Sequence, residues 1–136
     1  KEKQEATIYR GKKWIRTIFQ DVLKYKENLV FGSHGKFKEV LGPFFNQYQK
    51  IKKQLKIHTK LLLSKRARNS EIVRLTHGET KFLSKEYDSP VSTIIYNNKV
   101  AIIIWTEEPI GFLLRGEEVA KSFRNYFDVI WKIAKS

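Results

Sequence analysis

The sequence predicts a mixed α/β fold, in which helices flank one β-sheet that contains both parallel and antiparallel strands. In the first half, short apolar segments alternate with segments whose apolar residues recur at helical spacing. In the second half, short apolar segments follow one another between turns, as in an antiparallel meander. A length of 136 residues with 41% hydrophobic residues suits one buried core, so we expect residues 1–136 to form a single domain.

The first half should contain three strands and two helices. In chain order we expect a strand at residues 6–11, a helix at 12–26, a strand at 28–32, a helix at 36–55 and a strand at 56–65. Gly42-Pro43 should kink the second helix, because proline cannot continue the helical hydrogen bonding. The apolar stripe of that helix, which should face the core, comprises Phe37, Val40, Leu41, Phe44, Phe45, Tyr48, Ile51 and Leu55.

The second half should contain a short helix, four strands and a long final helix. We expect a helix that starts at Asn69 or Ser70, strands at 80–84, within 89–105 (two) and at 110–116, and a helix from about Glu117. Asn97-Asn98 suits the turn between the paired strands, because asparagine tolerates positive φ. The apolar face of the final helix comprises Val119, Phe123, Tyr126, Phe127, Ile130, Trp131 and Ala134.

Positive charge is concentrated in the first half of the chain. Residues 1–65 carry 16 Lys and Arg against 5 Asp and Glu, whereas residues 66–136 carry 11 against 9. This excess favours nucleic acid, an anionic ligand or an acidic partner. The alternative is a lysine-rich surface of the kind found in proteins from hot environments.

Two basic runs are candidate contacts for a phosphate backbone. The residues are Lys50, Lys53, Lys56, Arg66 and Arg68. Lys50, Lys52, Lys53 and Lys56 cannot all lie on one helical face. We expect these four lysines on the solvated side of the helix, around its apolar stripe. Few aromatic residues accompany them, which disfavours single-strand binding.

The loop GSHGKFK at residues 32–38 is the strongest candidate for a ligand site. It follows an expected strand and opens a helix, where free backbone N–H groups can hold an anion. Ser33, His34, Gly35 and Lys36 are the candidate ligand-binding residues there. The alternative is an ordinary strand-to-helix turn with glycines.

The sequence offers no set of residues for catalysis or for a metal. It has no cysteine, and His34, His58 and His77 form no close ligand pair. The acidic pairs lie at expected turns and helix starts, which the helix dipole explains. We therefore expect no enzyme activity, no metal and no cofactor.

Four segments together resemble a known family. They are IYRGKKWIRTIFQDVL, NLVFGSHGKF, KFLSKEYDSPVSTIIYNNKVAIIIWTEEP and VAKSFRNYFDVIWKIAK, which span nearly the whole chain. In their order they resemble the C-terminal domain of archaeal TrmB-family transcriptional regulators. The resemblance implies half of a phospholipase D-type fold that senses an effector and forms a dimer, with a winged-helix DNA-binding domain at the N-terminus. The sequence lacks methionine even at position 1, so we expect that preceding domain to lie outside it.

The resemblance also implies where a phospholipase D motif, H-x-K-x-x-x-x-D, would lie. With Asn97 at the acidic position, the histidine position falls on Pro90 and the lysine position on Ser92. None of the three catalytic residues is present, so the domain should lack that chemistry. The same face is a candidate for ligand recognition, which makes Ser92 a further candidate binding residue.

Three hypotheses follow. The first is a cytoplasmic effector-sensing and dimerisation domain, which forms a homodimer, binds a small anionic or polar effector and reaches DNA through the preceding domain. The second is a basic nucleic-acid-binding module. The third, a phosphodiester hydrolase, depends on His34, the histidine of the loop at residues 32–38 beside the possible anion site. No apolar run approaches the roughly 20 residues of a membrane span, so we expect no membrane contact.

Overall fold

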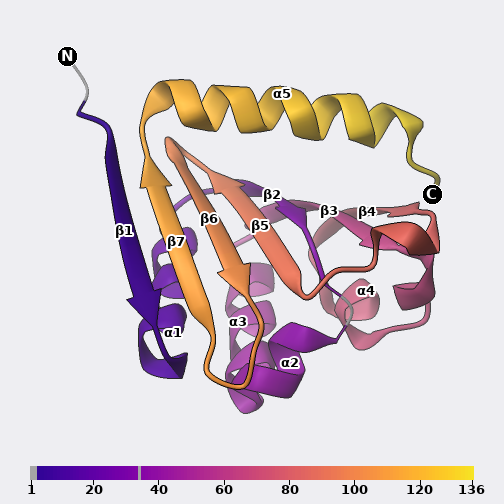
Figure 1. Cartoon of the computed structure of the whole chain (residues 1–136). Helices are drawn as coiled ribbons and strands as arrows, with labels where there is room; N and C mark the ends of the chain where they lie inside the picture. Colours follow the sequence, from indigo (N-terminus) through magenta and orange to yellow (C-terminus); the bar gives the residue numbers. More distant parts are fainter. Residues whose placement is uncertain (1–2, 34) are drawn as a thin grey trace.

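A seven-stranded sheet with helices on both faces forms the body of the computed structural model, which describes residues 3–33 and 35–136 (Figure 1). The strands are β1 (Glu5–Arg10), β2 (Glu27–Phe31), β3 (His58–Ser64), β4 (Gly78–Leu83), β5 (Val91–Tyr96), β6 (Lys99–Ile104) and β7 (Ile110–Arg115). The α-helices are α1 (Lys12–Val22), α2 (Lys36–Leu41), α3 (Pro43–Gln54), α4 (Glu71–Leu75) and α5 (Glu117–Ile133). The expected α/β class and every expected element are confirmed.

The sheet joins a parallel part to an antiparallel part. Its strand order is β1-β7-β6-β5-β2-β3-β4. Strands β2, β3 and β4 run parallel, and β5, β6 and β7 form the expected meander. The two parts meet where β2 pairs antiparallel with β5, so the end of β2 lies beside the start of β5.

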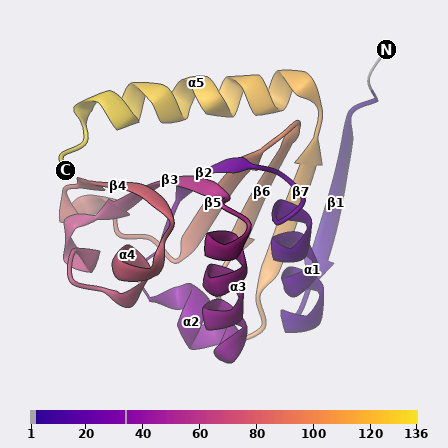
Figure 2. The same cartoon turned by 180° about the vertical axis from the view of Figure 1, so that it is seen from behind.

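Two hydrophobic layers cover the two faces of the sheet. On one face, α1, α2 and α3 bury aromatic and aliphatic side chains against alternate residues of β5 and β6 (Figure 2). On the other face, α5 packs against the intervening residues, with Phe127 at its centre. The alternation follows from strand geometry, because successive side chains point to opposite faces.

The kink at Gly42-Pro43 separates α2 from α3 and changes which face of α3 is buried. Gly42 adopts a φ of 56°, which ends α2, and Pro43 starts the new helix. The prediction that Ile51 and Leu55 face the core is wrong, since they are 38% and 48% exposed. The inward face carries Phe45, Tyr48, Gln49 and Lys52, which follow helical spacing from the restarted helix.

Helix α5 exposes an apolar stripe on its outer side. Tyr126, which the sequence analysis groups with Phe127 on one apolar face, does not share the burial of Phe127 and is 60% exposed. Val129 and Ile133 lie three and seven residues further on and are 64% and 69% exposed. These three residues, the outer stripe of α5, share one side of the helix.

The two edges of the sheet differ. At β4, the backbone of Phe82 exchanges hydrogen bonds with that of Lys135, so the end of the chain pairs with this edge at one residue. At the other edge, β1 pairs only with β7 among the described residues, and nearly all of its side chains are exposed. The β4 edge is therefore occupied in part by the chain itself, and the β1 edge is open along its described residues.

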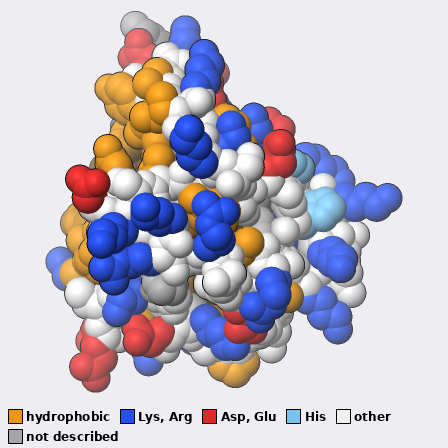
Figure 3. All heavy atoms as spheres, turned by 90° about the vertical axis from the view of Figure 1, so that its right-hand side faces the viewer, with side chains coloured by type: hydrophobic (Ala, Val, Ile, Leu, Met, Phe, Trp, Pro, Cys, Tyr) orange, Lys and Arg blue, Asp and Glu red, His pale blue; other side chains and the backbone are white. Residues whose placement is uncertain are grey.

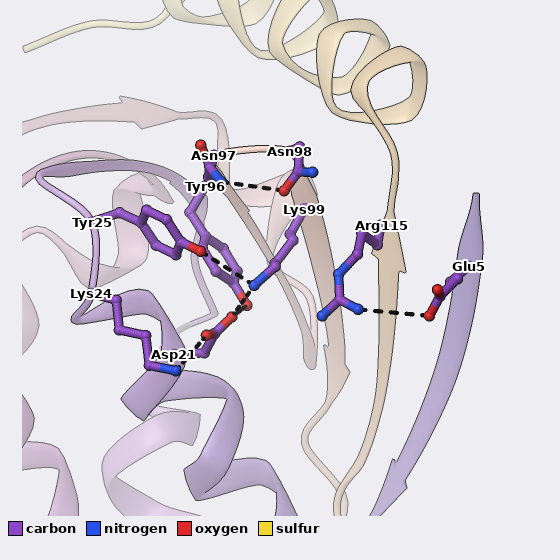
Figure 4. A network of polar contacts seen from close by, with 9 residues as sticks. All are labelled: Glu5, Asp21, Lys24, Tyr25, Tyr96, Asn97, Asn98, Lys99 and Arg115. Carbon is purple, nitrogen blue, oxygen red and sulfur yellow. Dashed lines mark hydrogen bonds and ion pairs between the residues drawn. The ribbon is translucent and has the colours of Figure 1, made fainter. Parts of the chain in front are cut away.

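A polar network ties α1 to the β5–β6 hairpin (Figure 4). Asp21 on α1 accepts hydrogen bonds from Lys99 and Tyr96, and Lys24 lies 3.4 Å from its other carboxylate oxygen. Burial alone would raise the pKa of Asp21, but the hydrogen bonds from Lys99 and Tyr96 outweigh it and hold that pKa below its ordinary value. This network fixes the hairpin that carries Ser92.

Candidate ligand-binding site

Two serines meet where β2 ends and β5 begins. The Oγ atoms of Ser33 and Ser92 lie 3.2 Å apart, and the indole Nε1 of Trp105 donates to Ser92 at 2.8 Å. Both serines are buried. At the neighbouring Gly32 an added Cβ would lie 2.6 Å from a side-chain methyl of Leu63, so a larger residue there would require Leu63 to shift. The sheet therefore holds two hydroxyl groups and one indole together in its interior.

A small cavity of about 40 Å³ lies beside these serines, between the sheet and α3. Aromatic rings of Phe19, Phe37 and Trp105 form much of its wall. These rings also stack on one another, with centroids 4.2 Å apart for Phe19 and Phe37 and 5.5 Å apart for Phe37 and Trp105. We call this space, with Ser33, Ser92, Gln49 and Lys52 in its lining, the inner cavity.

Lys52 is the charged group of the inner cavity. Its side chain is only 3% exposed, and its Nζ lies 5.2 Å from the ring centre of Tyr48. Among the described residues it has neither a hydrogen bond nor an ion pair. Burial lowers the pKa of Lys52 from 10.5 to about 7. The expectation that Lys52 lies on the solvated side of the helix is wrong, because the kink turns it toward the sheet.

Gln49 lies one turn before Lys52 on the same face of α3. It is 4% exposed, and its carbonyl Oε1 is buried without a hydrogen-bond partner in the described structure. The nearby Thr59 donates to Asn28 at 2.9 Å and so does not satisfy Gln49. An unpaired buried acceptor is destabilising and points to a missing partner.

A larger cavity of about 310 Å³ lies toward α2 and α4. Ser33, Phe37 and Ile72 line both this outer cavity and the inner one. Lys38 on α2 pairs with Glu71 on α4 at 2.9 Å beside it. This pairing holds the pKa of Glu71 below its ordinary value. A ligand with its head in the inner cavity therefore has space beside it for a larger body.

The structure brings together only part of the predicted ligand site. Ser33 and Ser92 meet in the inner cavity, and Gly35 lines the outer cavity. Lys36 is paired with Glu39 at 3.1 Å on the surface and lines neither cavity, so the prediction for Lys36 is not supported. His34 lies outside the described residues.

Gln49, Lys52 and Trp105 line the inner cavity but are not among the ligand-binding residues that the sequence predicts. The sequence pattern indicates only a strand end at Trp105 and a solvated lysine at Lys52. A signal was present: Phe45, Tyr48, Gln49 and Lys52 recur at the spacing of a helix that begins at Pro43.

The predicted nucleic-acid contacts divide into two sets. Lys50, Lys53 and Lys56 are exposed at α3 and the turn that follows it. Arg66 instead lies 3.3 Å from Asp88, and the guanidinium of Arg68 lies 4.2 Å from the ring centre of Phe82. Figure 3 shows Lys and Arg side chains spread over one face, with fewer acidic groups between them.

Metal-ligating groups do not converge in the part of the chain that the structure describes. His58 and His77 face each other with ring centroids 6.5 Å apart, and His58 lies 3.7 Å from Glu79. No group of three or more possible ligands forms within residues 3–33 and 35–136. In the same residues, no helix has the length and apolar character to cross a membrane.

Comparison with solved structures shows that this chain shares its fold with several proteins of low sequence identity. NucT from Helicobacter pylori matches with a TM-score of 0.75 at 7% identity, covering 98% of this chain and 99% of that one. Nuc from Salmonella typhimurium, a phospholipase D family member, matches with a TM-score of 0.67 at 9% identity, covering 98% and 97%. No protein-family model and no curated protein sequence matches the chain.

TrmBL2, an archaeal chromatin protein whose structure shows a novel mode of DNA binding, has the same fold in part of its chain. The match has a TM-score of 0.60 at 16% identity and covers 96% of this chain. It covers 53% of TrmBL2, so the present chain spans about half the length of that protein. The fold expected from the sequence is thereby confirmed.

Proposed function

We propose that this phospholipase D-like domain is the non-catalytic, effector-sensing and dimerisation part of a cytoplasmic DNA-binding transcription regulator. The inner cavity is its effector site. The observation that carries this proposal is that the positions which the resemblance assigns to the reactive histidine and lysine hold Pro90 and Ser92, and that Ser92 lines the inner cavity. Ser92, at the lysine position of the phospholipase D pattern, is buried and hydrogen-bonded to Trp105.

Lack of catalysis is supported by the surroundings of Ser92. Pro90, at the histidine position, has no side-chain nucleophile and uses its carbonyl to accept from the backbone of Trp105 at 2.9 Å. Of the residues that the structure describes, none in the lining of the inner cavity is a histidine. Phosphodiester hydrolysis by the phospholipase D route needs a nucleophilic histidine.

The test is an assay of the purified chain on bis(4-nitrophenyl) phosphate and on single- and double-stranded DNA. We expect no turnover above that of a Ser92→Ala variant. Turnover that this substitution abolishes would show that the site is catalytic and would overturn the proposal.

Dimerisation is proposed to use the outer stripe of α5. The whole chain has a net charge of +13, which opposes self-association, but α5 carries equal numbers of acidic and basic residues. A second copy can approach there with little repulsion, and Tyr126, Val129 and Ile133 supply exposed apolar area. Sedimentation should show a dimer that Val129→Asp dissociates and the nearby Lys132→Gln does not. A wild-type monomer at about 100 μM would contradict this surface.

Contact of this domain with nucleic acid is a second candidate, favoured by the exposure of Lys50, Lys53 and Lys56. Exposed lysines bind phosphates without reading sequence, so affinity should fall steeply with salt. The triple substitution of these lysines by glutamine should weaken duplex DNA binding at about 50 mM salt. If the wild-type chain shows no measurable binding to duplex DNA at about 50 mM salt, this candidate is contradicted.

A further inference from the structure

We propose that the inner cavity binds a small 2-hydroxycarboxylic acid, whose carboxylate pairs with Lys52 and whose hydroxyl donates to Gln49. This inference names the class of effector for the proposed function and rests on that function. Two buried and unpartnered polar groups on one face of α3 carry it.

The first requirement is an anion. Lys52 is the only basic residue among the described residues that line the inner cavity, and its amine lacks a counter-ion there. Of the described residues in this lining, the only other titratable one is Tyr48, whose pKa burial raises, so Tyr48 remains neutral. A carboxylate entering this space would hold Lys52 protonated and form a charge-assisted hydrogen bond.

The second requirement is a hydrogen-bond donor. Gln49 presents an unpaired carbonyl oxygen, which only a donor can satisfy. Gln49 and Lys52 are three residues apart on α3 and therefore neighbours on its surface. A hydroxyl on the carbon next to a carboxylate places a donor and an anion side by side, which matches this cation and acceptor.

The third requirement is size. The inner cavity of about 40 Å³ has room for only a few heavy atoms, because one water needs about 10–15 Å³ on this scale. Its aromatic wall excludes bulky polar groups. A phosphate dianion would face a single lysine in an apolar site, which leaves one charge uncompensated. Glycolate is the smallest 2-hydroxy acid, and with five heavy atoms it needs part of the outer cavity as well, which shares Ser33, Phe37 and Ile72 with the inner one.

Isothermal titration of the chain at constant ionic strength tests the inference with four probes: glycolate, acetate, glycolamide and inorganic phosphate. Glycolate should bind best. Acetate lacks the hydroxyl and should bind about 2–10-fold more weakly, as expected for one neutral hydrogen bond. Glycolamide lacks the negative charge and should bind at least about 10-fold more weakly, as should phosphate.

Matched variants assign each contact. Lys52→Met keeps the shape of the side chain and should weaken glycolate and acetate by at least about 10-fold. Gln49→Leu should lower glycolate affinity to that of acetate and leave acetate unchanged. Lys12→Met, an exposed position on α1, is the control for general charge and should change nothing.

Each contrary result has a definite meaning. Unchanged glycolate affinity in Lys52→Met would show that the acid binds elsewhere on the basic surface, and would overturn the inference. Preference for phosphate would overturn the carboxylate class. Failure of all probes to bind the wild-type chain would also overturn it.

The failure of this inference is distinguishable from failure of the proposed function. The hydrolysis assay and the sedimentation experiment test the absence of catalysis and the dimer without reference to any acid. A chain that is dimeric and inactive but indifferent to glycolate would keep the regulatory proposal and lose only the ligand class.

Discussion

The Nζ of Lys99 lies 2.7 Å from Oδ2 of Asp21, and this pair joins the first helix to the central hairpin across 78 residues of sequence. Both side chains are largely buried, 10% and 20% exposed. The hydroxyl of Tyr96 donates to the same oxygen at 2.8 Å. A single carboxylate therefore accepts from two elements of the hairpin, which makes it a sensitive point for mutation.

Asp21→Asn should lower the free energy of unfolding by about 2–3 kcal/mol, because it leaves Lys99 buried without its counter-charge. Urea denaturation at pH 7 measures this. The double variant Asp21→Asn/Lys99→Met should recover part of the loss, since no buried charge then remains. Glu39→Gln, which breaks an exposed pair with Lys36, is the control and should change stability by less than about 1 kcal/mol.

The Asp21 effect should depend on pH in a defined direction. The pKa of Asp21 is lower in the folded chain than in the unfolded chain, so its stabilising contribution is present above about pH 4 and lost as the pH falls through the folded-state value. The stability difference between wild type and Asp21→Asn should therefore shrink in acid. A difference that stays constant from pH 7 to pH 3 would contradict the network in Figure 4.

Lys52→Met should stabilise the ligand-free chain, and more so at low pH. The pKa of Lys52 falls from 10.5 when unfolded to about 7 when folded. Between these values the unfolded chain binds more protons, so the contribution of Lys52 to stability rises with pH by about 1.4 kcal/mol per unit. Below about pH 7 Lys52 is charged in both states, and the full destabilisation from burying its charge is present. Denaturation of both proteins from pH 6 to pH 10 should show their stabilities converging as the pH rises.

Gly78→Ala should be far more destabilising than Gly35→Ala. Both glycines have positive φ, 143° and 70°, so both substitutions introduce backbone strain of about 1–2 kcal/mol. At Gly78 an added Cβ would also lie 2.0 Å from the backbone oxygen of Thr59, whereas at Gly35 nothing lies within 4 Å. We expect a loss above about 3 kcal/mol for Gly78→Ala by thermal or urea unfolding. Equal losses at the two positions would contradict the close approach of β4 to β3.

Trp105 should report ligand entry by its fluorescence, because its indole lines the inner cavity. Glycolate should produce a saturable change in emission that Trp105→Phe removes. Trp14→Phe should retain the change, since Trp14 is 51% exposed on α1, away from the inner cavity. A signal that survives in Trp105→Phe and disappears in Trp14→Phe would place the acid at the surface.

The fold was predictable because its signals are local. The hairpin turn at Asn97, where φ is 49°, and the helix that begins at Glu117 are visible in short segments. The orientation of α3 was harder to predict. In the sequence the apolar stripe runs continuously across Gly42-Pro43, and only a helix that starts again at Pro43 turns Gln49 and Lys52 toward the sheet. Ser33 and Ser92 were both candidates, but their meeting depends on the pairing of β2 with β5, 59 residues away in sequence.

The two edges of the sheet differ in how readily a strand of another copy could join them. A strand added at β1 would extend the sheet by main-chain hydrogen bonding. At the opposite edge the chain's own Lys135 pairs with Phe82, the fifth of the six residues of β4, and interrupts that edge. Among the described residues, β1 therefore offers the longer uninterrupted main-chain edge, and sheet extension by a second copy is favoured at that end of the sheet.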